Sequence, residues 1–377
     1  MDLDLPAEYE DFRAVVRDFA ATRIAPVAEE LDREHRFPYA IVAEMAELGL
    51  MGIPFPEEVG GAGGDTLTYA IAIEELTRVD ASVGVTVAAH TSLGTMPIHL
   101  FGTDAQRAEL LPDLVSGRAL AAFGLTEPEA GSDAGNPRTR AELEDGMWRI
   151  NGSKMFITNS GTDISRCVTI TARTGDDEIS TIIVPNGTPG YTQSAPLRKM
   201  GWHASDTREL TFADCRVPEA NLLGPRGMGF KQFLQILDGG RISIAAMGLG
   251  TMQAAYDLSA AYAAERNQFG RPIKDFQAIR FKLADMAVDL AAARALVYRA
   301  AWLKDQGRPY AHEASIAKLF TGEGSNRAVN QAVQIHGGYG YMDEYPISRI
   351  YRDQKVLEIG EGTNEVQRLV IARGLGL

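Results

Sequence analysis

The chain has 377 residues and a formal net charge of −13, from 37 Lys and Arg against 50 Asp and Glu. At about 150 residues per domain it has room for two or three domains with substantial cores, which excludes a peptide-sized or metal-stapled fold. The negative charge repels phosphate backbones and anionic lipid, so it argues against a general nucleic-acid binder.

The N-terminus and the cysteines bear on the cellular compartment. Residues 1–6 are acidic and lack the pattern of a signal peptide, and no stretch approaches the roughly 18 apolar residues of a membrane span. Cys167 and Cys215 are too few for a disulfide framework, and we interpret them as reduced, packed side chains. The six His show no metal-ligand spacing. We therefore expect a cytoplasmic protein with no integral membrane segment and no metal.

The first predicted domain, residues 1–118, is helical. Phe12, Val15, Val16 and Phe19 recur at the spacing of one helix face, which predicts an amphipathic helix with this stripe buried. Pro and Gly clusters then separate Ala-rich stretches that suit closely packed helices. We expect a helical bundle here.

Residues 119–228 form the second predicted domain, which is β. Short β-branched runs, such as 167–171 and 180–184, are separated by turn clusters such as 174–177. Because no long helical pattern alternates with these strands, a parallel doubly wound sheet is disfavoured. An antiparallel barrel or sandwich is expected instead.

The third predicted domain, residues 229–377, returns to a helical period. Its clearest feature is an apolar run at alternating four- and three-residue steps, which is typical of the seam of a long-helix bundle. The run consists of Ile279, Leu283, Met286, Leu290, Ala293 and Val297. The whole chain is thus predicted to be a multidomain α+β protein.

Two segments of the β domain offer chemistry to a cofactor. Residues 123–133 combine Gly, Ser and Thr, whose N–H groups and hydroxyls can approach a pyrophosphate, although on composition alone an ordinary polar loop is the better explanation. Residues 148–159 suggest a hairpin whose second strand presents Phe156 and Thr158 on one side, a pairing that suits a flat heteroaromatic ring. No phosphate loop and no glycine fingerprint within a βαβ unit occurs, so a dinucleotide would be held another way.

Six motifs follow one another in a specific order along the chain. They are Leu-Thr-Glu-Pro-x-Ala-Gly-Ser-Asp at 125–133, Gly-x-Lys-x-Phe-Ile-Thr-Asn at 152–159, Leu-Asp-Gly-Gly-Arg at 237–241, Glu-Arg-x-Gln-Phe-Gly at 265–270, Gln-Ile-x-Gly-Gly-x-Gly at 334–340 and Glu-Gly-Thr at 361–363. Over its whole length the chain resembles the acyl-CoA dehydrogenase family, in particular its short-chain, butyryl-CoA dehydrogenase-like members. The resemblance implies an N-terminal helical domain, a central β domain and a C-terminal four-helix bundle, assembled as a homotetramer with FAD across a subunit interface.

The resemblance also implies which residues bind FAD. Thr126 and Thr158 would hydrogen-bond the flavin ring, and Phe156 would lie against it. Arg266 would reach the FAD of a neighbouring subunit, where a guanidinium offers paired donors to a pyrophosphate dianion. The full set of expected cofactor contacts is Phe123, Leu125, Thr126, Ser132, Phe156, Ile157, Thr158, Arg266, Gln268, Phe269, Gln277, Gln334, Gly338, Thr363 and Glu365.

For the substrate, the resemblance implies contacts from Ser132, Asp238, Arg241 and Gly362. The implied reaction removes an α proton and a β hydride from a saturated acyl-CoA, giving the trans-2-enoyl-CoA, as in fatty-acid β-oxidation. The electrons would pass to an electron-transferring flavoprotein. Glu361 matches the family's catalytic base, and a dry pocket would raise its pKa and strengthen it. Its N–H and a ribityl hydroxyl would polarise the thioester oxygen.

Three glycines depart from patterns found in parts of that family. Some members carry the base immediately before the Arg of the 237–241 motif, where this chain has Gly240, so Glu361 is the only candidate. Many medium-chain members have Tyr where this chain has Gly360. Glutaryl-CoA dehydrogenases have Arg where it has Gly84. A small residue near the base and no carboxylate clamp suggest a short or branched acyl chain.

Competing hypotheses remain open at this stage. An enzyme that uses the same site in the reverse direction is an enoyl-CoA reductase. An enzyme in which oxygen reaches the reduced flavin is an acyl-CoA oxidase. A catalytically silent flavoprotein that serves as an assembly partner is a third hypothesis, which the presence of Glu361, Arg241 and the flavin segments disfavours. Acyl length, direction and electron acceptor are not determined by the sequence.

Overall fold

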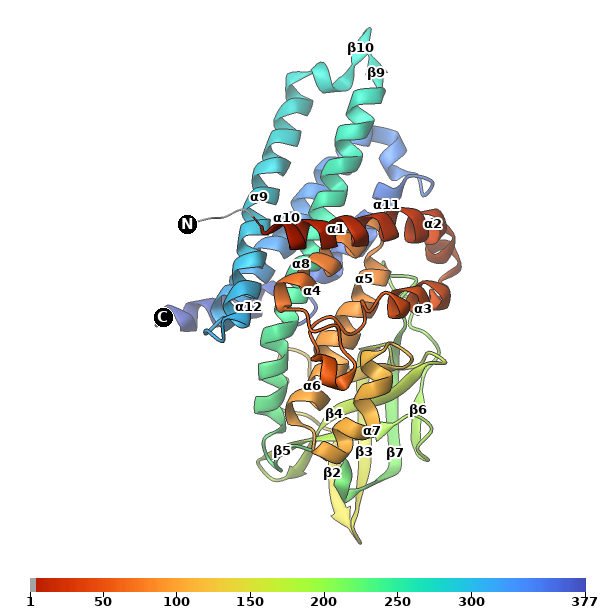
Figure 1. The fold of residues 1–377 in the computed structure, drawn as a ribbon, viewed down its shortest axis with the longest axis vertical. Coiled ribbons are helices and arrows are strands. Elements are labelled where there is room, and N and C mark those ends of the chain that lie inside the picture. Colours follow the sequence, from red (N-terminus) through yellow and green to blue (C-terminus); the bar gives the residue numbers. More distant parts are fainter. Residues whose placement is uncertain (1–4) are drawn as a thin grey trace.

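The computed structural model describes residues 5–377, which fold into three parts in chain order (Figure 1). Helices α1 to α7 come first, strands β1 to β8 form a sheet, and helices α8 to α12 complete the chain. This order confirms the predicted helical, β and helical architecture. Within residues 5–377, no helix combines the length and the apolar character needed to cross a bilayer.

The N-terminal part is a set of helices joined by short turns. They are α1 (Ala7–Phe19), η1 (Ala20–Ile24), α2 (Ala25–Glu34), α3 (Tyr39–Glu47), η2 (Glu57–Val59), α4 (Thr66–Val79), α5 (Ala81–Ala88), η3 (Ala89–Thr95), α6 (Met96–Phe101) and α7 (Asp104–Val115). Asp65 and Asp80 begin α4 and α5, and each carboxylate accepts a hydrogen bond from the N–H three residues later. Such N-caps satisfy donors that a helix leaves free at its start.

The central sheet has the strand order β6-β7-β3-β2-β4-β5-β8, with β1 also paired to β4. The strands are β1 (Leu120–Gly124), β2 (Arg140–Glu144), β3 (Met147–Thr158), β4 (Ser165–Gly175), β5 (Glu178–Pro185), β6 (Tyr191–Gln193), β7 (Thr207–Pro218) and β8 (Leu222–Leu223). Most pairs are antiparallel as predicted, but β1 with β4 and β2 with β4 are parallel. The sheet is therefore mixed, because a long loop rather than a hairpin follows β1 and leaves its direction free.

Residues 148–159 do not form the predicted hairpin. Residues 148–158 belong to the single strand β3, and the turn that joins β2 to β3 precedes them at Asp145 and Gly146, both at positive φ. Inside β3, Gly152 accompanies a shift in the register of β3 with β7. A glycine inside a strand often marks such a bulge.

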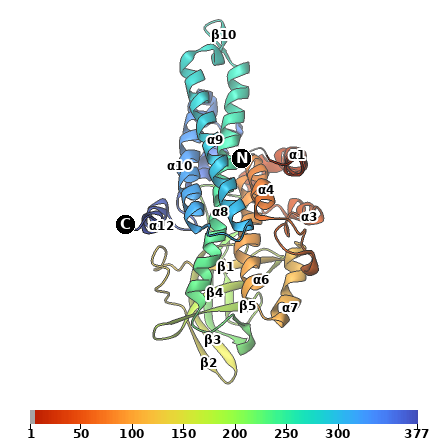
Figure 2. The same ribbon diagram turned by 60° about the vertical axis from the view of Figure 1, so that its left-hand side comes forward.

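The C-terminal part is built on three long helices. Its elements are α8 (Gly229–Glu265), β9 (Asn267–Gln268), β10 (Arg271–Pro272), η5 (Ile273–Asp275), α9 (Gln277–Asp305), α10 (Ala311–His336), η6 (Gly337–Tyr341), α11 (Pro346–Asp353), η7 (Gln354–Glu358) and α12 (Asn364–Gly374). Figures 1 and 2 show the β9–β10 hairpin at the far end of α8 and α9, away from the sheet. The predicted seam is confirmed, since Met286, Leu290, Ala293 and Val297 are buried and Ile279 and Leu283 pack against the same core.

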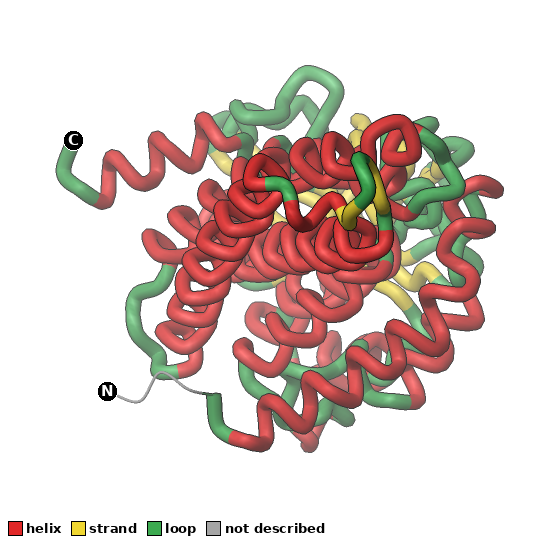
Figure 3. Tube along the Cα trace, turned by 90° about the horizontal axis from the view of Figure 1, so that it is seen from above, coloured by secondary structure: helices red, strands yellow, loops and turns green. Residues whose placement is uncertain are grey.

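One apolar core joins the N-terminal and C-terminal helices. Ile71 and Leu76 of α4 are fully buried in the same cluster as Leu249 of α8. Figure 3, a view along the long axis, shows the helices of the two parts side by side. The sheet has a separate core around Trp148 and Ile170. The two helical parts therefore share one core, and the sheet, with its own core, packs against them.

The buried face of α1 differs from the prediction. Val16 and Phe19 are buried, but Val15 is 59% exposed and Arg13 is only 6% exposed. The Arg13 guanidinium reaches carboxylates inside the protein, 3.3 Å from both Glu74 and Glu75 of α4. A buried charge with such partners can occupy a face that hydrophobic periodicity assigns to apolar residues.

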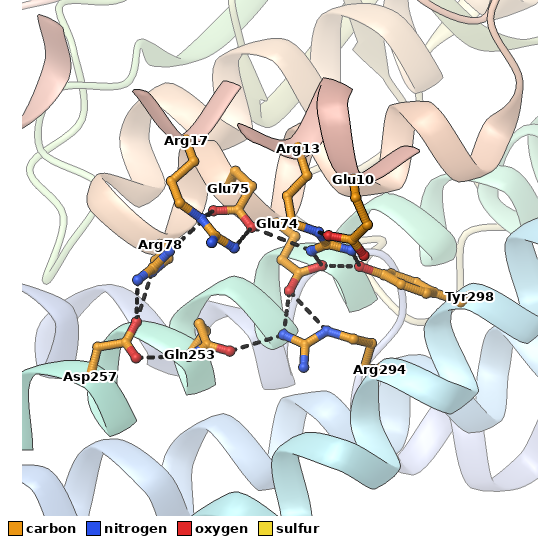
Figure 4. A network of polar contacts seen from close by, with 10 residues as sticks. All are labelled: Glu10, Arg13, Arg17, Glu74, Glu75, Arg78, Gln253, Asp257, Arg294 and Tyr298. Carbon is orange, nitrogen blue, oxygen red and sulfur yellow. Dashed lines mark hydrogen bonds and ion pairs between the residues drawn. The ribbon is translucent and has the colours of Figure 1, made fainter. Parts of the chain in front are cut away.

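Arg13 belongs to a network of charged and polar side chains that ties α1 to α4, α8 and α9 (Figure 4). Glu74, which is fully buried, also accepts a hydrogen bond from Arg294 of α9 at 2.6 Å. The network comprises Glu10, Arg13, Arg17, Glu74, Glu75, Arg78, Gln253, Asp257, Arg294 and Tyr298. Because removal of one member leaves a buried charge unpaired, the network fixes how these helices pack.

Candidate active site

Glu361 lies in a tight turn between η7 and α12. Its φ is +54° and that of the next residue, Gly362, is +90°. Thr363 then begins α12, with its hydroxyl accepting a hydrogen bond from the Val366 N–H at 3.3 Å. A left-handed conformation is uncommon for a residue with a Cβ, and such strain is found where the surrounding structure holds a functional side chain in place.

The carboxylate of Glu361 is turned into the protein. Its Oε2 is buried and has no hydrogen-bond partner among residues 5–377. A Cβ built on Gly240 of α8 would lie 2.2 Å from this oxygen. Burial raises the pKa of Glu361 to about 8, against the opposing effect of the cations Arg241 and Lys318. Desolvation thus keeps the carboxyl group ready to exchange a proton near neutral pH.

Lys318 and Gln367 hold the turn that carries Glu361. The fully buried Lys318 donates from Nζ to the Gly362 carbonyl oxygen at 2.9 Å and to Asn364 Oδ1 at 3.1 Å. Gln367 Nε2 donates to the Gly362 carbonyl oxygen at 3.0 Å. Sequence reasoning missed both residues. The available indication was a lysine on the otherwise small and apolar face of α10.

Asp238 and Arg241 lie on α8 beside the base. Arg241 is buried and donates from Nη1 to Asp238 Oδ1 at 2.6 Å, while its Nε has no partner among residues 5–377. The structure therefore brings together four of the residues singled out in the sequence, namely Asp238, Gly240, Arg241 and Glu361. The Nε–H of Arg241 remains free for a further acceptor.

The start of α8 contacts β5, where Thr181 Oγ1 donates to Gln232 Oε1 at 3.0 Å, and it also contacts β1. Phe123 stacks on Phe233 of α8, with ring centroids 4.0 Å apart. Phe233 precedes Gly240 by seven residues, so both lie on one face of α8, about 10 Å apart along the axis. Gly94 of η3 packs against β1, since its Cβ would lie 2.2 Å from the Ala121 carbonyl oxygen. The end of β1 therefore lies on the same side of α8 as the base.

An ion pair fixes the two sheet segments expected to bind the flavin. The fully buried Lys154 donates from Nζ to Glu127 Oε1 at 2.7 Å and to the Leu125 carbonyl oxygen at 3.2 Å. The Met155 N–H donates to the Thr126 carbonyl oxygen at 2.8 Å. Both charged residues lie inside the quoted motifs, but their role as a pair was not predicted. The contacts bring residues 125–127 beside residues 154–156.

Phe156 and the two threonines are placed to receive a flat ring. Phe156 has φ +63° at a shift in the register of β3 with β7, and its ring is 66% exposed. Within residues 5–377 the hydroxyls of Thr126 and Thr158 have no hydrogen-bond partner from side chain or backbone. An exposed aromatic ring and free hydroxyls fit the isoalloxazine of FAD. Ile157 faces the sheet core, which leaves only its backbone for a ligand, and Ser132 is exposed on the loop after β1.

A second set of predicted cofactor residues lies at the far end of α8 to α10. Phe269 and Gly270 form the two-residue turn of the β9–β10 hairpin, both at positive φ, and Phe269 is 93% exposed. Arg266 is exposed, with its guanidinium carbon 5.4 Å from the centroid of the Tyr339 ring. The remaining members of this set, all exposed, are Gln268, Gln277, Gln334 and Gly338. Glu365 is exposed in the first turn of α12, close to the base in sequence.

Comparisons with known proteins cover the whole chain. Three models of acyl-CoA dehydrogenase domains match, the N-terminal one over residues 6–118, the middle one over 122–215 and the C-terminal one over 227–376. The chain is 54% identical to the probable acyl-CoA dehydrogenase YngJ of Bacillus subtilis, over 100% of both chains. It is 45% identical to an acryloyl-CoA reductase (NADH) of Anaerotignum propionicum, over 99% of this chain and 95% of that one. The solved structure of butyryl-CoA dehydrogenase from Megasphaera elsdenii matches with a TM-score of 0.97 at 43% identity, over 100% of both chains.

Proposed function

This chain belongs to the acyl-CoA dehydrogenase family and is an FAD-dependent oxidoreductase of fatty acid metabolism, and from that premise we propose that it dehydrogenates short or branched acyl-CoA thioesters to their trans-2-enoyl products. The observation that carries the proposal is the carboxylate of Glu361, which is buried without a hydrogen-bond partner among residues 5–377 and faces Gly240. Position 240, where some members of the family carry the base, is a glycine and supplies no alternative carboxylate.

In the proposed reaction, Glu361 takes the α proton of the thioester onto its carboxylate. Its raised pKa, about 8, makes it a stronger base than a solvated carboxylate, which a weakly acidic carbon requires. The Glu361 N–H is proposed to donate to the thioester oxygen, and the turn held by Lys318 and Gln367 orients it. FAD, when bound, supplies the acceptor for the β hydride.

The two sets of predicted cofactor residues support an assembly with FAD between subunits. Figure 1 places the β9–β10 hairpin at one end of the molecule and β2 and β3 at the other. Phe269 lies in the hairpin beyond the end of α8, about 38 Å along that helix from Gly240, whereas Phe156 belongs to strand β3 of the sheet. We therefore propose that Arg266, Phe269 and the residues around them bind the FAD of a second copy, in a homotetramer.

The proposed preference for short or branched chains follows from the glycines near the base. A Cβ on Gly360 would meet only the Val356 carbonyl oxygen, at 3.4 Å, so this position leaves open space beside Glu361. Gly84 has no open space beside it, since its Cβ would lie 2.2 Å from Thr77 Oγ1 of α4. An arginine that clamps a terminal carboxylate does not fit at Gly84 in this packing, which disfavours dicarboxylic substrates.

The electron acceptor is proposed to be an electron-transferring flavoprotein. Reduction of an enoyl-CoA by the same site is the second candidate, and the 45% identity to an acryloyl-CoA reductase specifically favours retaining it. The two directions share the base and the pocket. They differ in which partner exchanges electrons with the protein.

Anaerobic titration of the purified holoenzyme tests the proposal. We expect butyryl-CoA and isobutyryl-CoA to bleach the flavin absorbance, dodecanoyl-CoA to do so poorly and glutaryl-CoA not at all. Glu361→Gln is the matched control, because it keeps the shape and the N–H while removing a base that is typically worth about 10²–10⁴ in rate. Rapid bleaching of this variant, or a preference for dodecanoyl- or glutaryl-CoA, would contradict the proposal. NADH-dependent reduction of crotonyl-CoA without a second flavoprotein would support the reductase.

A further inference from the structure

Three arginines line a surface pocket away from Glu361. Arg138, Arg140 and Arg173 border a pocket of about 390 Å³ where β2 begins and β4 ends. The chain carries a net charge of −13, so such a concentration of positive charge runs against its overall balance. A local cluster of this kind attracts anions that the rest of the surface repels.

The sheet itself forces two of these charges together. Arg140 of β2 is the register partner of Arg173 of β4 in the parallel pair. Residues opposite each other in neighbouring strands point to the same face, and like charges in that position destabilise a sheet. A bound anion between the two guanidinium groups removes this repulsion.

Neither of these two arginines is neutralised by the protein. Within residues 5–377, Arg140 makes no side-chain hydrogen bond or ion pair, and Arg173 donates only to the Asp176 carbonyl oxygen and to Asn136 Oδ1. Glu142 also lines the pocket, but it pairs with Arg149 at 2.5 Å. The two guanidinium groups therefore keep donors free.

The remaining charged residues of the pocket do not neutralise Arg140 and Arg173. Arg138 lies 3.7 Å from Glu129, and both side chains are more than two-thirds exposed, a geometry that contributes little to stability. Asp176 lies on the rim and its carboxylate makes no ion pair within the described chain. The net charge of the pocket is positive at neutral pH.

The pocket adjoins the loop that carries Ser132. Arg173 donates to Asn136 Oδ1 at 3.3 Å, and the Asn136 N–H donates to the Asp133 carbonyl oxygen at 3.1 Å. The same loop packs on the start of α8, where a Cβ on Gly135 would lie 3.4 Å from the Phe230 ring. A ligand that passes Ser132 can thus extend toward the arginines.

The geometry points to a phosphate site, in which Arg140 and Arg173, with Arg138 at the rim, bind the phosphate monoester at the nucleotide end of the acyl-CoA. This inference rests on the proposed function, because Ser132 is proposed to contact the pantetheine arm of that substrate. A monoester dianion matches two unneutralised guanidinium groups, whose forked donors bind phosphate oxygens in pairs.

The test compares butyryl-CoA with butyryl-dephospho-CoA, which lacks only the 3′-phosphate, on the holoenzyme. We expect KM to be about tenfold lower for butyryl-CoA, as a partly exposed charge-assisted contact allows. Arg140→Gln with Arg173→Gln should raise KM for butyryl-CoA to the dephospho value and leave the dephospho value unchanged. Arg166→Gln with Arg216→Gln is the control, because it removes the same charge from the same sheet outside the pocket and should preserve the tenfold ratio.

A binding measurement separates this inference from the proposed function. Adenosine 3′,5′-bisphosphate should bind wild-type holoenzyme more tightly than adenosine 5′-monophosphate in calorimetry, and the pocket variant should lose that difference. Equal KM values in the wild type, or an equal rise for both substrates in the variant, would overturn the inference. So would inorganic phosphate that binds at the arginines without competing with butyryl-CoA. If no acyl-CoA reduces the flavin, the proposed function is wrong. The comparison of bisphosphate with monophosphate binding then still tests whether the arginines bind the 3′-phosphate.

Discussion

Gly240 faces Glu361 so closely that a Cβ on the glycine would lie 2.2 Å from Glu361 Oε2. The same Cβ would lie 2.9 Å from Leu93 Cδ2 of η3. The absence of a side chain at position 240 is therefore a condition for the carboxylate to lie where it does. Gly240 reaches this point of the site from α8, and Glu361 reaches it from the turn between η7 and α12.

Gly240→Ala should displace the carboxylate of Glu361 without disturbing the flavin segments. Because a shift of about 1 Å can cost up to 10²-fold in rate, we expect kcat for butyryl-CoA to fall by about 10- to 100-fold. Gly239→Ala is the control, since its Cβ comes no closer than 3.3 Å to the flexible end of Lys304 and 3.8 Å to the Tyr310 hydroxyl. Steady-state kinetics and flavin absorbance check the prediction, which unchanged kcat in Gly240→Ala would contradict.

The pKa of Glu361, raised by burial to about 8, has two consequences for pH dependence. The base acts only when ionised, so kcat/KM should rise with pH up to about 8. The effect of rising pH on the stability of the folded state has the opposite sign. The folded state holds this proton more tightly than the unfolded state, so the contribution of Glu361 is present below its unfolded pKa and is lost as pH rises through about 8. Urea unfolding at several pH values should show this loss in the wild type and not in Glu361→Gln.

Lys318→Met should remove both the positive charge near Glu361 and the donor to the Gly362 carbonyl oxygen. Since Lys318 lowers the pKa of Glu361, its loss should move the pH profile of kcat/KM to more alkaline values and reduce kcat. Lys199→Met is the control. Lys199 is a half-buried lysine, and it donates to the Ser205 carbonyl oxygen at 2.6 Å. A profile that shifts equally in both variants would assign Lys318 a purely structural role.

Gly360→Tyr should narrow the acyl pocket beside the base. A side chain there has room to form, because its Cβ has only one contact, at 3.4 Å. Its ring should exclude a methyl branch before a linear chain, so kcat/KM should fall more for isobutyryl-CoA than for butyryl-CoA. Gly338→Ala, at η6 in the set expected to bind the FAD of a second copy, lies outside the acyl pocket and should preserve the ratio of the two substrates whatever its effect on kcat. An unchanged ratio in Gly360→Tyr would place Gly360 outside the pocket.

Arg266→Ala should lower the FAD content of the purified protein more than its helix content. Arg266 is exposed and makes no ion pair within residues 5–377, so its removal leaves no buried charge unpaired. The ratio of flavin to protein absorbance and the circular dichroism at 222 nm check this. If FAD binds between subunits, loss of FAD should accompany dissociation on a sizing column. A monomer fully loaded with FAD would contradict the proposed assembly.

The order of the three parts and the buried seam of α9 were predictable because both rest on local periodicity. Residues that recur at helical steps must pack on one side wherever the helix lies. The stripe of α1 was predicted less well, since the partners of Arg13 come from residues more than 60 positions away in the sequence. The parallel pairing of β1 with β4 likewise depends on which distant strand accepts it.

The sequence by itself determined the kind of protein, through motifs whose residue types and order identify the family and its base. Only the tertiary structure decided that Glu361 faces Gly240, that Lys318 holds its turn, and that Arg140 and Arg173 share one face of the sheet. Desolvation, charge repulsion and hydrogen bonding act between atoms that are close in space. A one-dimensional pattern records which side chains are available, and packing sets which of them meet.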